Sequence, residues 1–588
     1  MVDPEATGIA IGIDRSGDGG TDDWGYGIGE LGPLGLDDVL VTWGTGAEFN
    51  GEPVESTVDP DRNQIEVVVP RAPGEEVWRH YLAVGLFDAD EKRFRAVQEL
   101  PDGSNPGGAH GENPPPIFNV GFRFDEPVGA PNIDRDTGEI TVDLETGETL
   151  EDGTETGSRG LGYGHYRDHA QASALDKRDI SEFHADIDFE RLRRRETERH
   201  VPESGFMTRL YSSRYELGSG VDTEEDVLLG RVQPYGVYVP ENLETDDPAR
   251  LHLHMHSLGS TYNEYAVLSP NLYQQLGEDR NAIVLTPGGR GPAGWYRQEA
   301  ELDVFEAWND LAACYEIDFD NVTLGGYSMG GFGTFRLGAF YPDLFARTFI
   351  VAAAANDTYE GSSDRLLDTF RSLPVLMWNG ANDQLVPAPA YTATQERLRE
   401  LGYRHELDVF PGYDHFTFAI DDEWGPGREF LNDSEVPRRP SEVTYRRIPR
   451  FDAEQFDLVH DGAFWISDIG VEGNVDDGTI SVRSLAIGET PPETNDYERT
   501  GTEPAPHQKR GTEWDLPRDS APTENALEID LSDVTRSTIW VTEAGLASED
   551  PITLHLDSDQ EATLRLTDGE REETVEVPTG ESEQTIEL

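Results

Sequence analysis

The stretch GGYSMGG, Gly325–Gly331, holds one serine among four glycines. Its core has the form G-x-S-x-G, in which a tight turn from a strand into a helix exposes the serine hydroxyl as a nucleophile. An apolar run ends just before the motif, and the helical pattern of Met329–Phe340 follows it. We therefore interpret Ser328 as a nucleophile. Short motifs also arise by chance, so the competing interpretation is a plain serine in a flexible glycine loop.

A serine hydroxyl attacks a carbonyl when a base removes its proton and an acid orients that base. Asp383 and His415 each follow a short apolar run that predicts a strand, and both come after Ser328 in the chain. The carboxyl ends of parallel strands meet at one edge of a sheet, so we expect the three side chains to converge there. The alternatives are Asp408 or Asp414 as the acid, an ordinary turn aspartate, and a surface histidine.

Two other groups of residues raise the question of a metal. His252, His254 and His256 alternate in LHLHMH and therefore face one side of a strand. An H-x-H pair can bind zinc, but no distant Cys or His set completes a site, so we expect hydrogen-bonded core residues. The acidic segment Asp14–Trp24 lacks the spacing of a known calcium loop, and we expect a solvated loop there. We predict no metal and no cofactor.

The elements that must position the candidate triad alternate between short apolar runs and amphipathic segments. This alternation predicts an α/β fold with a mostly parallel sheet covered by helices on both faces. The runs that predict strands are 235–240, 251–256, 282–287, 321–326, 348–354, 374–380 and 405–410. The serine turn therefore falls at the carboxyl edge of the expected sheet.

The regions on either side have the alternating apolar pattern of β structure. We predict four parts: 1–130 as a β-sandwich domain, 131–200 as an acidic linker and helical connector, 201–437 as the α/β unit, and 438–588 as a β-rich, sandwich-like region. Residues 488–525 show no periodicity, and we expect a loop or disordered segment there.

Three motifs resemble those of the α/β-hydrolase family: GYSMGG at the serine, GANDQLVP at the aspartate and GYDH at the histidine. The resemblance covers roughly Gly205–Leu431. It implies Ser328 as nucleophile, Asp383 as acid and His415 as base. The stretches PGGRGPAGWY and YEIDFDNVTLGGYSMGG look most like the prolyl-oligopeptidase, polyhydroxyalkanoate-depolymerase and feruloyl-esterase branches.

The resemblance also implies an oxyanion hole. In this family one amide comes from the residue after the nucleophile, which is Met329 here. A second comes from the loop HSLGS, which departs from the familiar H-G-G-G form, so that either Ser257 or Leu258 is the donor.

Aromatic residues near the same edge are candidates for the substrate pocket. We assign Tyr327 to substrate binding. Trp295 and Tyr296 lie in a glycine-rich loop after a strand and either line the acyl or alcohol pocket or pack the loop. Arg290, in the same loop, either meets an anionic substrate group or, as we expect in so acidic a chain, forms a salt bridge.

The charge of the chain is strongly one-sided, with 116 acidic and 46 basic residues and a net charge of -70. Such a chain repels nucleic acid and anionic membranes. Its 10 Trp, 21 Tyr and 24 Phe argue for folded cores rather than a disordered polyanion. At about 1 M salt the Debye length is roughly 3 Å, which screens the repulsion. The composition resembles that of proteins from extreme halophiles.

Few features of the sequence indicate where in the cell the protein is located. Cys314 is the single cysteine, so an intramolecular disulfide is excluded. No transmembrane run and no signal peptide are visible, which indicates a cytoplasmic protein unless a leader has been removed.

We therefore expect a serine hydrolase that cleaves small or polymeric carboxylic esters in high salt. A prolyl-oligopeptidase-like peptidase is the first alternative. A non-catalytic carbohydrate- or surface-binding protein is the second, and the β regions are candidates for contact with a glycan or polymer.

Overall fold

The computed structural model describes residues 7–15, 17, 19–59, 64–73, 77–96, 115–117, 119–121, 174–175, 177–195, 204–215, 221–222, 227–228, 231–241, 243, 247–356, 363–432, 434–471, 475–517 and 519–588. Two compact units make up the chain, Met1–Gly236 with Ala266–Leu268, and Val237–Tyr265 with Ser269–Leu588. The predicted acidic linker at 134–160 lies outside the described residues.

The first unit is built on a sheet with the order β5-β4-β3-β2-β1-β6-β7, in which β8 and β9 also pair with β6. Small residues on β1, such as Ala10, face one cluster of buried apolar side chains, and Ile13 faces another. Within the described residues these strands form one sheet, so the sandwich predicted for 1–130 stays a prediction. The elements are β1 (Thr7–Asp14), β2 (Asp38–Trp43), β3 (Gly46–Phe49), β4 (Glu52–Asp59), β5 (Gln64–Val68), β6 (Val77–Asp88), β7 (Arg93–Phe94), β8 (Asn119–Val120), β9 (Ala185–Asp188), α2 (Phe189–Arg194), β11 (Val221–Asp222) and β12 (Val227–Leu228).

A ten-stranded sheet has the order β10-β13-β15-β14-β16-β17-β18-β19-β24-β23. Neighbouring strands from β15 to β19 are parallel, as the sequence predicts. The strands are β10 (Gly205–Ser212), β13 (Val232–Val239), β14 (Ala249–Met255), β15 (Ala282–Pro287), β16 (Ile317–Tyr327), β17 (Thr348–Val351), β18 (Val375–Gly380) and β19 (His405–Phe410).

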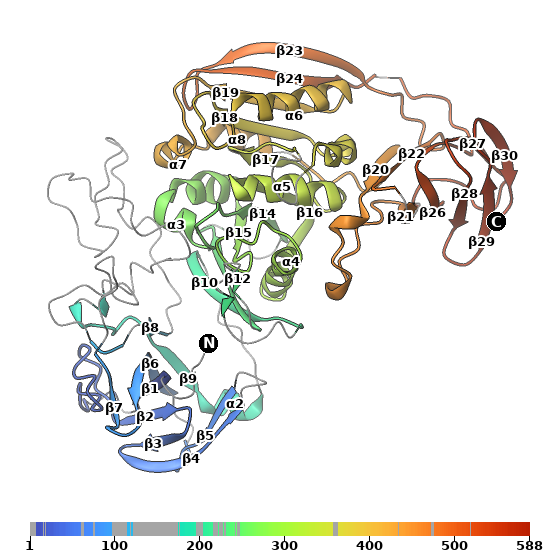
Figure 1. Ribbon diagram of the computed structural model, residues 1–588. Coiled ribbons are helices and arrows are strands. Elements are labelled where there is room, and N and C mark those ends of the chain that lie inside the picture. Colours follow the sequence, from blue (N-terminus) through green and yellow to red (C-terminus); the bar gives the residue numbers. More distant parts are fainter. Residues whose placement is uncertain are drawn as a thin grey trace. The chain divides into compact units, whose positions relative to one another are not determined.

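Helices pack against this parallel sheet, including α4 on β15 and α5 on β16 and β17 (Figure 1). Because β14, β15, β17 and β18 are buried almost throughout, both faces of these strands are covered. β15, β17 and β18 are mostly apolar without alternation, whereas β14 alternates buried histidines with apolar side chains. The helical elements are α3 (Glu264–Leu268), η2 (Tyr273–Gly277), η3 (Glu278–Arg280), α4 (Glu299–Ala312), α5 (Met329–Phe340), η4 (Asp364–Ser372), α6 (Ala388–Glu400), α7 (Thr417–Asp421) and α8 (Gly425–Leu431).

The segment expected to lack structure, 488–525, instead contains an antiparallel hairpin, which corrects the prediction for its central part. The hairpin consists of β23 (Glu493–Gly501) and β24 (His507–Asp515), and β24 pairs antiparallel with β19 at the edge of the sheet (Figure 1). The side chains of β23 are mostly exposed and polar, so the backbone ladder holds this hairpin without an apolar alternation that a sequence pattern would show.

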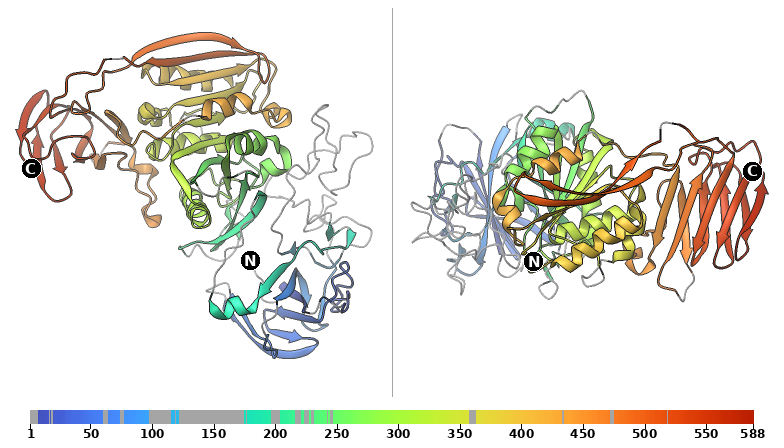
Figure 2. Two further views of the ribbon diagram at one scale, coloured as in Figure 1. Left: turned by 180° about the vertical axis from the view of Figure 1, so that it is seen from behind. Right: turned by 90° about the horizontal axis from the view of Figure 1, so that it is seen from above.

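The C-terminal region contains two further sheets, β20-β22-β25-β27-β30 and β21-β26-β28-β29 (Figure 2). One buried cluster takes side chains from both sheets, for example Leu554 from β27 and Leu564 from β28. Most of the intervening outward positions are polar. The elements are β20 (Glu442–Arg447), η5 (Pro449–Phe451), η6 (Glu454–Phe456), β21 (Ile466–Val471), β22 (Gly478–Ser484), β25 (Ala526–Ser532), β26 (Val534–Trp540), β27 (Ile552–Ser558), β28 (Ala562–Thr567), β29 (Glu572–Val577) and β30 (Ser582–Ile586).

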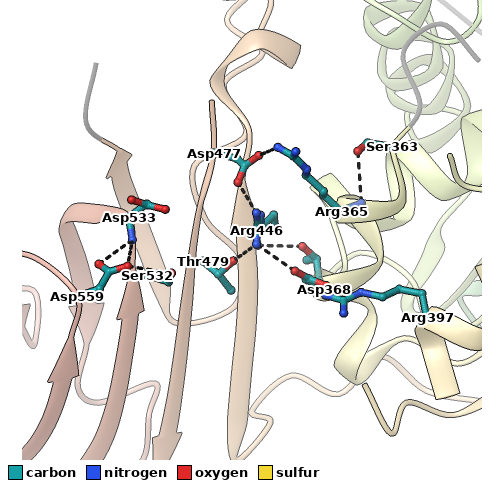
Figure 3. Close-up of polar contacts among 11 residues, drawn as sticks. Ser363, Arg365, Asp368, Arg397, Arg446, Asp477, Thr479, Ser532, Asp533 and Asp559 are labelled. Carbon is teal, nitrogen blue, oxygen red and sulfur yellow. Dashed lines mark hydrogen bonds and ion pairs between the residues drawn. The ribbon is translucent and has the colours of Figure 1, made fainter. Parts of the chain in front are cut away.

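Arginine and aspartate side chains join this region to the helices of the parallel sheet (Figure 3). Arg446 on β20 bridges Asp368 on η4 and Asp477, which is itself paired with Arg365. Arg397 on α6 also pairs with Asp368. The network is partly buried, and residues 438–588 belong to the same compact unit as most strands of the sheet.

Candidate active site

The candidate nucleophile lies on a strained turn between β16 and α5. Ser328 has φ 52° and ψ -115°, a conformation that non-glycine residues rarely adopt. A Cβ on Gly330 would lie 2.0 Å from the carbonyl oxygen of Met255, and one on Gly326 would lie 2.3 Å from that of Gly330. Both motif glycines are therefore required by close approach of backbone to backbone, which fits a nucleophile elbow.

The histidine predicted as base joins the other two predicted residues. His415 Nε2 lies 2.8 Å from Ser328 Oγ, and His415 Nδ1 lies 2.8 Å from Asp383 Oδ2. Asp383 and His415 are both buried, so little water competes for these bonds. The other oxygen of Asp383 accepts hydrogen bonds from the amides of Leu385 (2.8 Å) and Val386 (2.7 Å), which fixes the carboxylate beneath the imidazole.

The two other acids near this histidine in sequence have different partners. Asp414 Oδ1 accepts hydrogen bonds from the amides of Phe416 and Thr417, both at 3.0 Å, and these bonds cap the turn at the histidine. A hydrogen bond from the Thr417 hydroxyl is the main cause that lowers the pKa of Asp414. Asp408 is buried on β19 and pairs with Lys509 at 3.3 Å. Neither hydrogen-bonds to the His415 ring.

The amides predicted for the oxyanion hole differ in what they already bind. Met329 is the first residue of α5, where a backbone N–H has no partner inside the helix. The Ser257 amide donates to Glu264 Oε2 at 2.7 Å and is therefore engaged. Within the described residues, the Leu258 amide donates to no other group. Leu258, rather than Ser257, thus offers a donor in this loop.

Glu264, at the start of α3, is a residue of this site that the sequence did not predict. Its carboxyl is buried and holds both the amide and the hydroxyl of Ser257, so it anchors the loop between β14 and α3. Burial raises the pKa of Glu264 to about 7, against the opposing effect of the Ser257 hydrogen bonds. A lone glutamate before an apolar stretch carries no motif, so no sequence signal identifies it.

The three aromatic candidates occupy different places. Tyr327 is buried, and its hydroxyl donates to the backbone oxygen of His415, so it supports the histidine loop. Tyr296 is fully buried and donates to the carbonyl oxygen of His256 at 3.2 Å, which is the loop-packing alternative. Trp295 is partly exposed, and its ring lies 5.6 Å from that of Phe332.

Arg290 forms the salt bridges expected for it rather than facing a substrate. Its guanidinium is fully buried, 3.6 Å from Asp303 and 3.4 Å from Glu306. Asp303 also accepts a hydrogen bond from the amide of Gly289 at 2.8 Å. These contacts with α4 hold the loop after β15 in place.

The alternating histidines hydrogen-bond within the core. His252 Nδ1 lies 2.9 Å from the Thr323 hydroxyl, and its Nε2 lies 2.9 Å from His254 Nδ1. His256 Nε2 lies 3.0 Å from the carbonyl oxygen of Gly288. Burial lowers the pKa of all three, that of His254 to about 3, so the rings are neutral. In the described part of the chain, no group of three or more His, Cys, Asp and Glu could hold a metal.

Residues 262–435 match the Dienelactone hydrolase family. This range contains Ser328, Asp383 and His415, whereas the loop with Leu258 lies just before it. The match supports an α/β-hydrolase-like fold in this region. No curated protein matches the chain.

Solved structures of esterases are similar to part of the chain. A thermostable esterase is 18% identical over 39% of this chain and 63% of its own, with a TM-score of 0.31. A ferulic acid esterase is 16% identical over 39% of this chain and 98% of its own (TM-score 0.33). An S-formylglutathione hydrolase from Agrobacterium tumefaciens is 17% identical over 39% of this chain and 96% of its own (TM-score 0.32). The match thus spans less than two thirds of the thermostable esterase.

Among the described residues, no helix has the length and apolar character needed to cross a membrane.

Proposed function

We propose that this protein hydrolyses carboxylic esters through Ser328, His415 and Asp383. The observation that carries the proposal is the continuous chain of hydrogen bonds, 2.8 Å from Ser328 Oγ to the imidazole and 2.8 Å from the imidazole to the carboxylate. Nucleophile, base and orienting acid are the parts that acyl transfer requires. The strained elbow that presents the serine adds a second, independent support.

In this mechanism Ser328 attacks the ester carbonyl while His415 Nε2 takes its proton. The amides of Met329 and Leu258 stabilise the developing oxyanion, because donors aimed at the charge of the transition state lower its energy. His415 then protonates the departing alcohol, and an acyl-enzyme remains on Ser328. Water, activated by the same imidazole, releases the acid. Asp383 holds the ring with its Nδ1 proton toward the carboxylate throughout.

We propose that the substrates are carboxylic esters rather than peptides. Prolyl oligopeptidases resemble this chain, but they generally place a β-propeller of some 280 residues before the catalytic unit. Residues 1–200 show no repeat of blade length, and residues 262–435 match the Dienelactone hydrolase family. We propose instead that the flanking β regions act as sandwich-like accessory modules that present a glycan or polymer. The same proposal places the enzyme in high salt, where its charge of -70 is screened.

Substrate preference tests this assignment. In high salt, purified protein should hydrolyse short acyl or feruloyl esters with a higher kcat/KM than Gly-Pro or Ala-Pro p-nitroanilides. An ester has the better leaving group, so a triad without elaborate subsites turns it over. The measurement is kcat/KM for both classes on one preparation. A clear preference for the prolyl anilides would replace the esterase with the peptidase.

A further inference from the structure

A cavity of about 490 Å³, whose lining contains none of the three triad residues, opens where the loop before β19, the segment before β20 and the two segments flanking the hairpin β23–β24 meet. Its volume lies in the range of sites that bind small molecules. Four arginines line it, in a chain with only 46 basic residues against 116 acidic ones: Arg371, Arg404, Arg439 and Arg483. Three acidic residues line it as well: Glu442, Glu489 and Asp519. The lining therefore holds one more arginine than carboxylate, whereas the chain as a whole is strongly acidic.

Two of these arginines are already neutralised. Arg371 pairs with Glu442, and Arg483 pairs with Glu528 at 3.2 Å. Within the described residues, no carboxylate pairs with Arg404 or Arg439, although acidic side chains are abundant in this protein. Arg439 is exposed.

Arg404 is the unusual member of the set. Its guanidinium lies 4.7 Å from the centre of the Trp514 ring, and its Nε is buried without a hydrogen-bond partner. Burial and the nearby Arg347 lower the pKa of Arg404 to about 10, so the site disfavours the cation it holds. A partly buried cation without a counter-charge costs free energy, which an anion bound beside it would offset.

Many of the other lining residues are flat or apolar, beside the hydroxyl residues Ser372, Ser441, Thr490 and Ser520. The flat or apolar residues include Trp514, with its indole nitrogen fixed to the carbonyl oxygen of Gly402 at 2.7 Å, and Leu516, which is 73% exposed. Prolines complete this part of the wall, at Pro437, Pro440, Pro491, Pro492 and Pro517. Such surfaces accept the face of a ring, whereas guanidinium groups accept a carboxylate through paired hydrogen bonds.

We propose that this cavity binds a ring that bears a carboxylate, with the carboxylate on Arg404 and Arg439 and the ring against Trp514 and the prolines. A uronate residue of an acidic glycan and an aromatic acid share this chemistry. At about 1 M salt, long-range attraction is screened within roughly 3 Å, so the direct contacts of Arg404 are what retain the anion. The site is independent of Ser328, and its occupancy is measured without turnover.

Calorimetric titration of the full chain at about 1 M KCl tests the proposal. The probes are trigalacturonate with its neutral counterpart galactotriose, and ferulate with its neutral counterpart coniferyl alcohol. We expect one acid to bind more tightly than its neutral counterpart, and which acid binds identifies the source of the ring. Arg404→Gln should weaken binding about tenfold or more, because it removes charge-assisted hydrogen bonds.

The control is Arg499→Gln, on the β23–β24 hairpin that also carries Trp514. Arg499 also stacks on an aromatic ring, 4.2 Å from the centre of Tyr497, but it pairs with Glu513 and lies outside the cavity, so binding should not change. Arg439→Gln, at an exposed position, provides a second test if Arg404→Gln fails to fold, and it should also weaken binding. The proposal is wrong if neither acid binds at about 10 mM, if acid and neutral probes bind equally, or if both cavity variants bind like the wild type.

Discussion

Three acidic side chains lie near His415, in space or in sequence, and their partners decide which can serve its imidazole. Asp383 is buried and lies 2.8 Å from Nδ1, whereas Asp414 caps the turn and Asp408 pairs with Lys509. An acid next to its histidine in sequence has too little chain to reach back to Nδ1. We therefore propose that the acid comes from the end of another strand, β18.

Asparagine substitutions at two of these positions should separate their roles. Asp383→Asn should lower kcat by about four orders of magnitude, because the amide favours the wrong imidazole tautomer. Asp414→Asn removes part of a cap and should leave kcat within a fewfold of the wild type while lowering the melting temperature slightly. Steady-state kinetics on an ester and circular dichroism measure both. The opposite pattern would move the acid to Asp414.

The loop between β14 and α3 depends on a buried carboxyl. Glu264 holds Ser257, and the next residue, Leu258, supplies the amide that we propose for the oxyanion hole. Because burial raises the pKa of Glu264 from 4.5 to about 7, the neutral carboxyl is favoured on folding. Its contribution to stability is therefore present below pH 4.5 and lost as pH rises through 7.

Glu264→Gln tests this effect on the loop. The shift from 4.5 to about 7 corresponds to at most about 3 kcal/mol of unfolding free energy. The variant does not titrate and keeps an oxygen for the Ser257 amide, so its unfolding free energy should fall less than that of the wild type between pH 5 and pH 8. Denaturant titrations of both proteins at the two pH values give this difference. Equal changes in the two proteins would show that Glu264 does not titrate as described.

At the level of elements, the sequence predicted strands and turns that carry a recognisable residue pattern, and it missed elements that carry none. The buried strands β14 to β18 and the turn at Ser328 carry apolar runs and a glycine motif, so their order and type could be predicted. The hairpin β23–β24 could not, because its exposed polar strands are held by backbone pairing with β19. The sequence predicted a salt bridge for Arg290 but not its partners, and it did not indicate Glu264, because both depend on which distant residues fold together.

The whole molecule carries a net charge of -70, which folding concentrates within two compact units. At about 0.1 M salt the Debye length is roughly 10 Å, and these charges repel one another across the surface. The arginine and aspartate network around Arg446 is partly buried and is screened less than surface pairs. Surface repulsion therefore dominates the response of the chain to salt.

Dialysis from molar KCl or NaCl to about 0.1 M should cause loss of esterase activity and of near-UV circular dichroism. The melting temperature should rise steadily as salt increases toward the molar range. A salt series measured by differential scanning calorimetry tests this, with activity read in parallel on the same samples. A melting temperature that does not change with salt would contradict adaptation of the chain to high salt.

The central claim is that Ser328 is a nucleophile activated by His415, and a fluorophosphonate probe tests it most directly. In high salt the wild type should be labelled, and mass spectrometry of its peptides should place the adduct on Ser328. Ser328→Ala should show no adduct and no ester turnover while its near-UV circular dichroism is unchanged, because members of a triad act as a unit. A folded wild type that resists the probe, or a Ser328→Ala variant that is still labelled and active, would contradict the account.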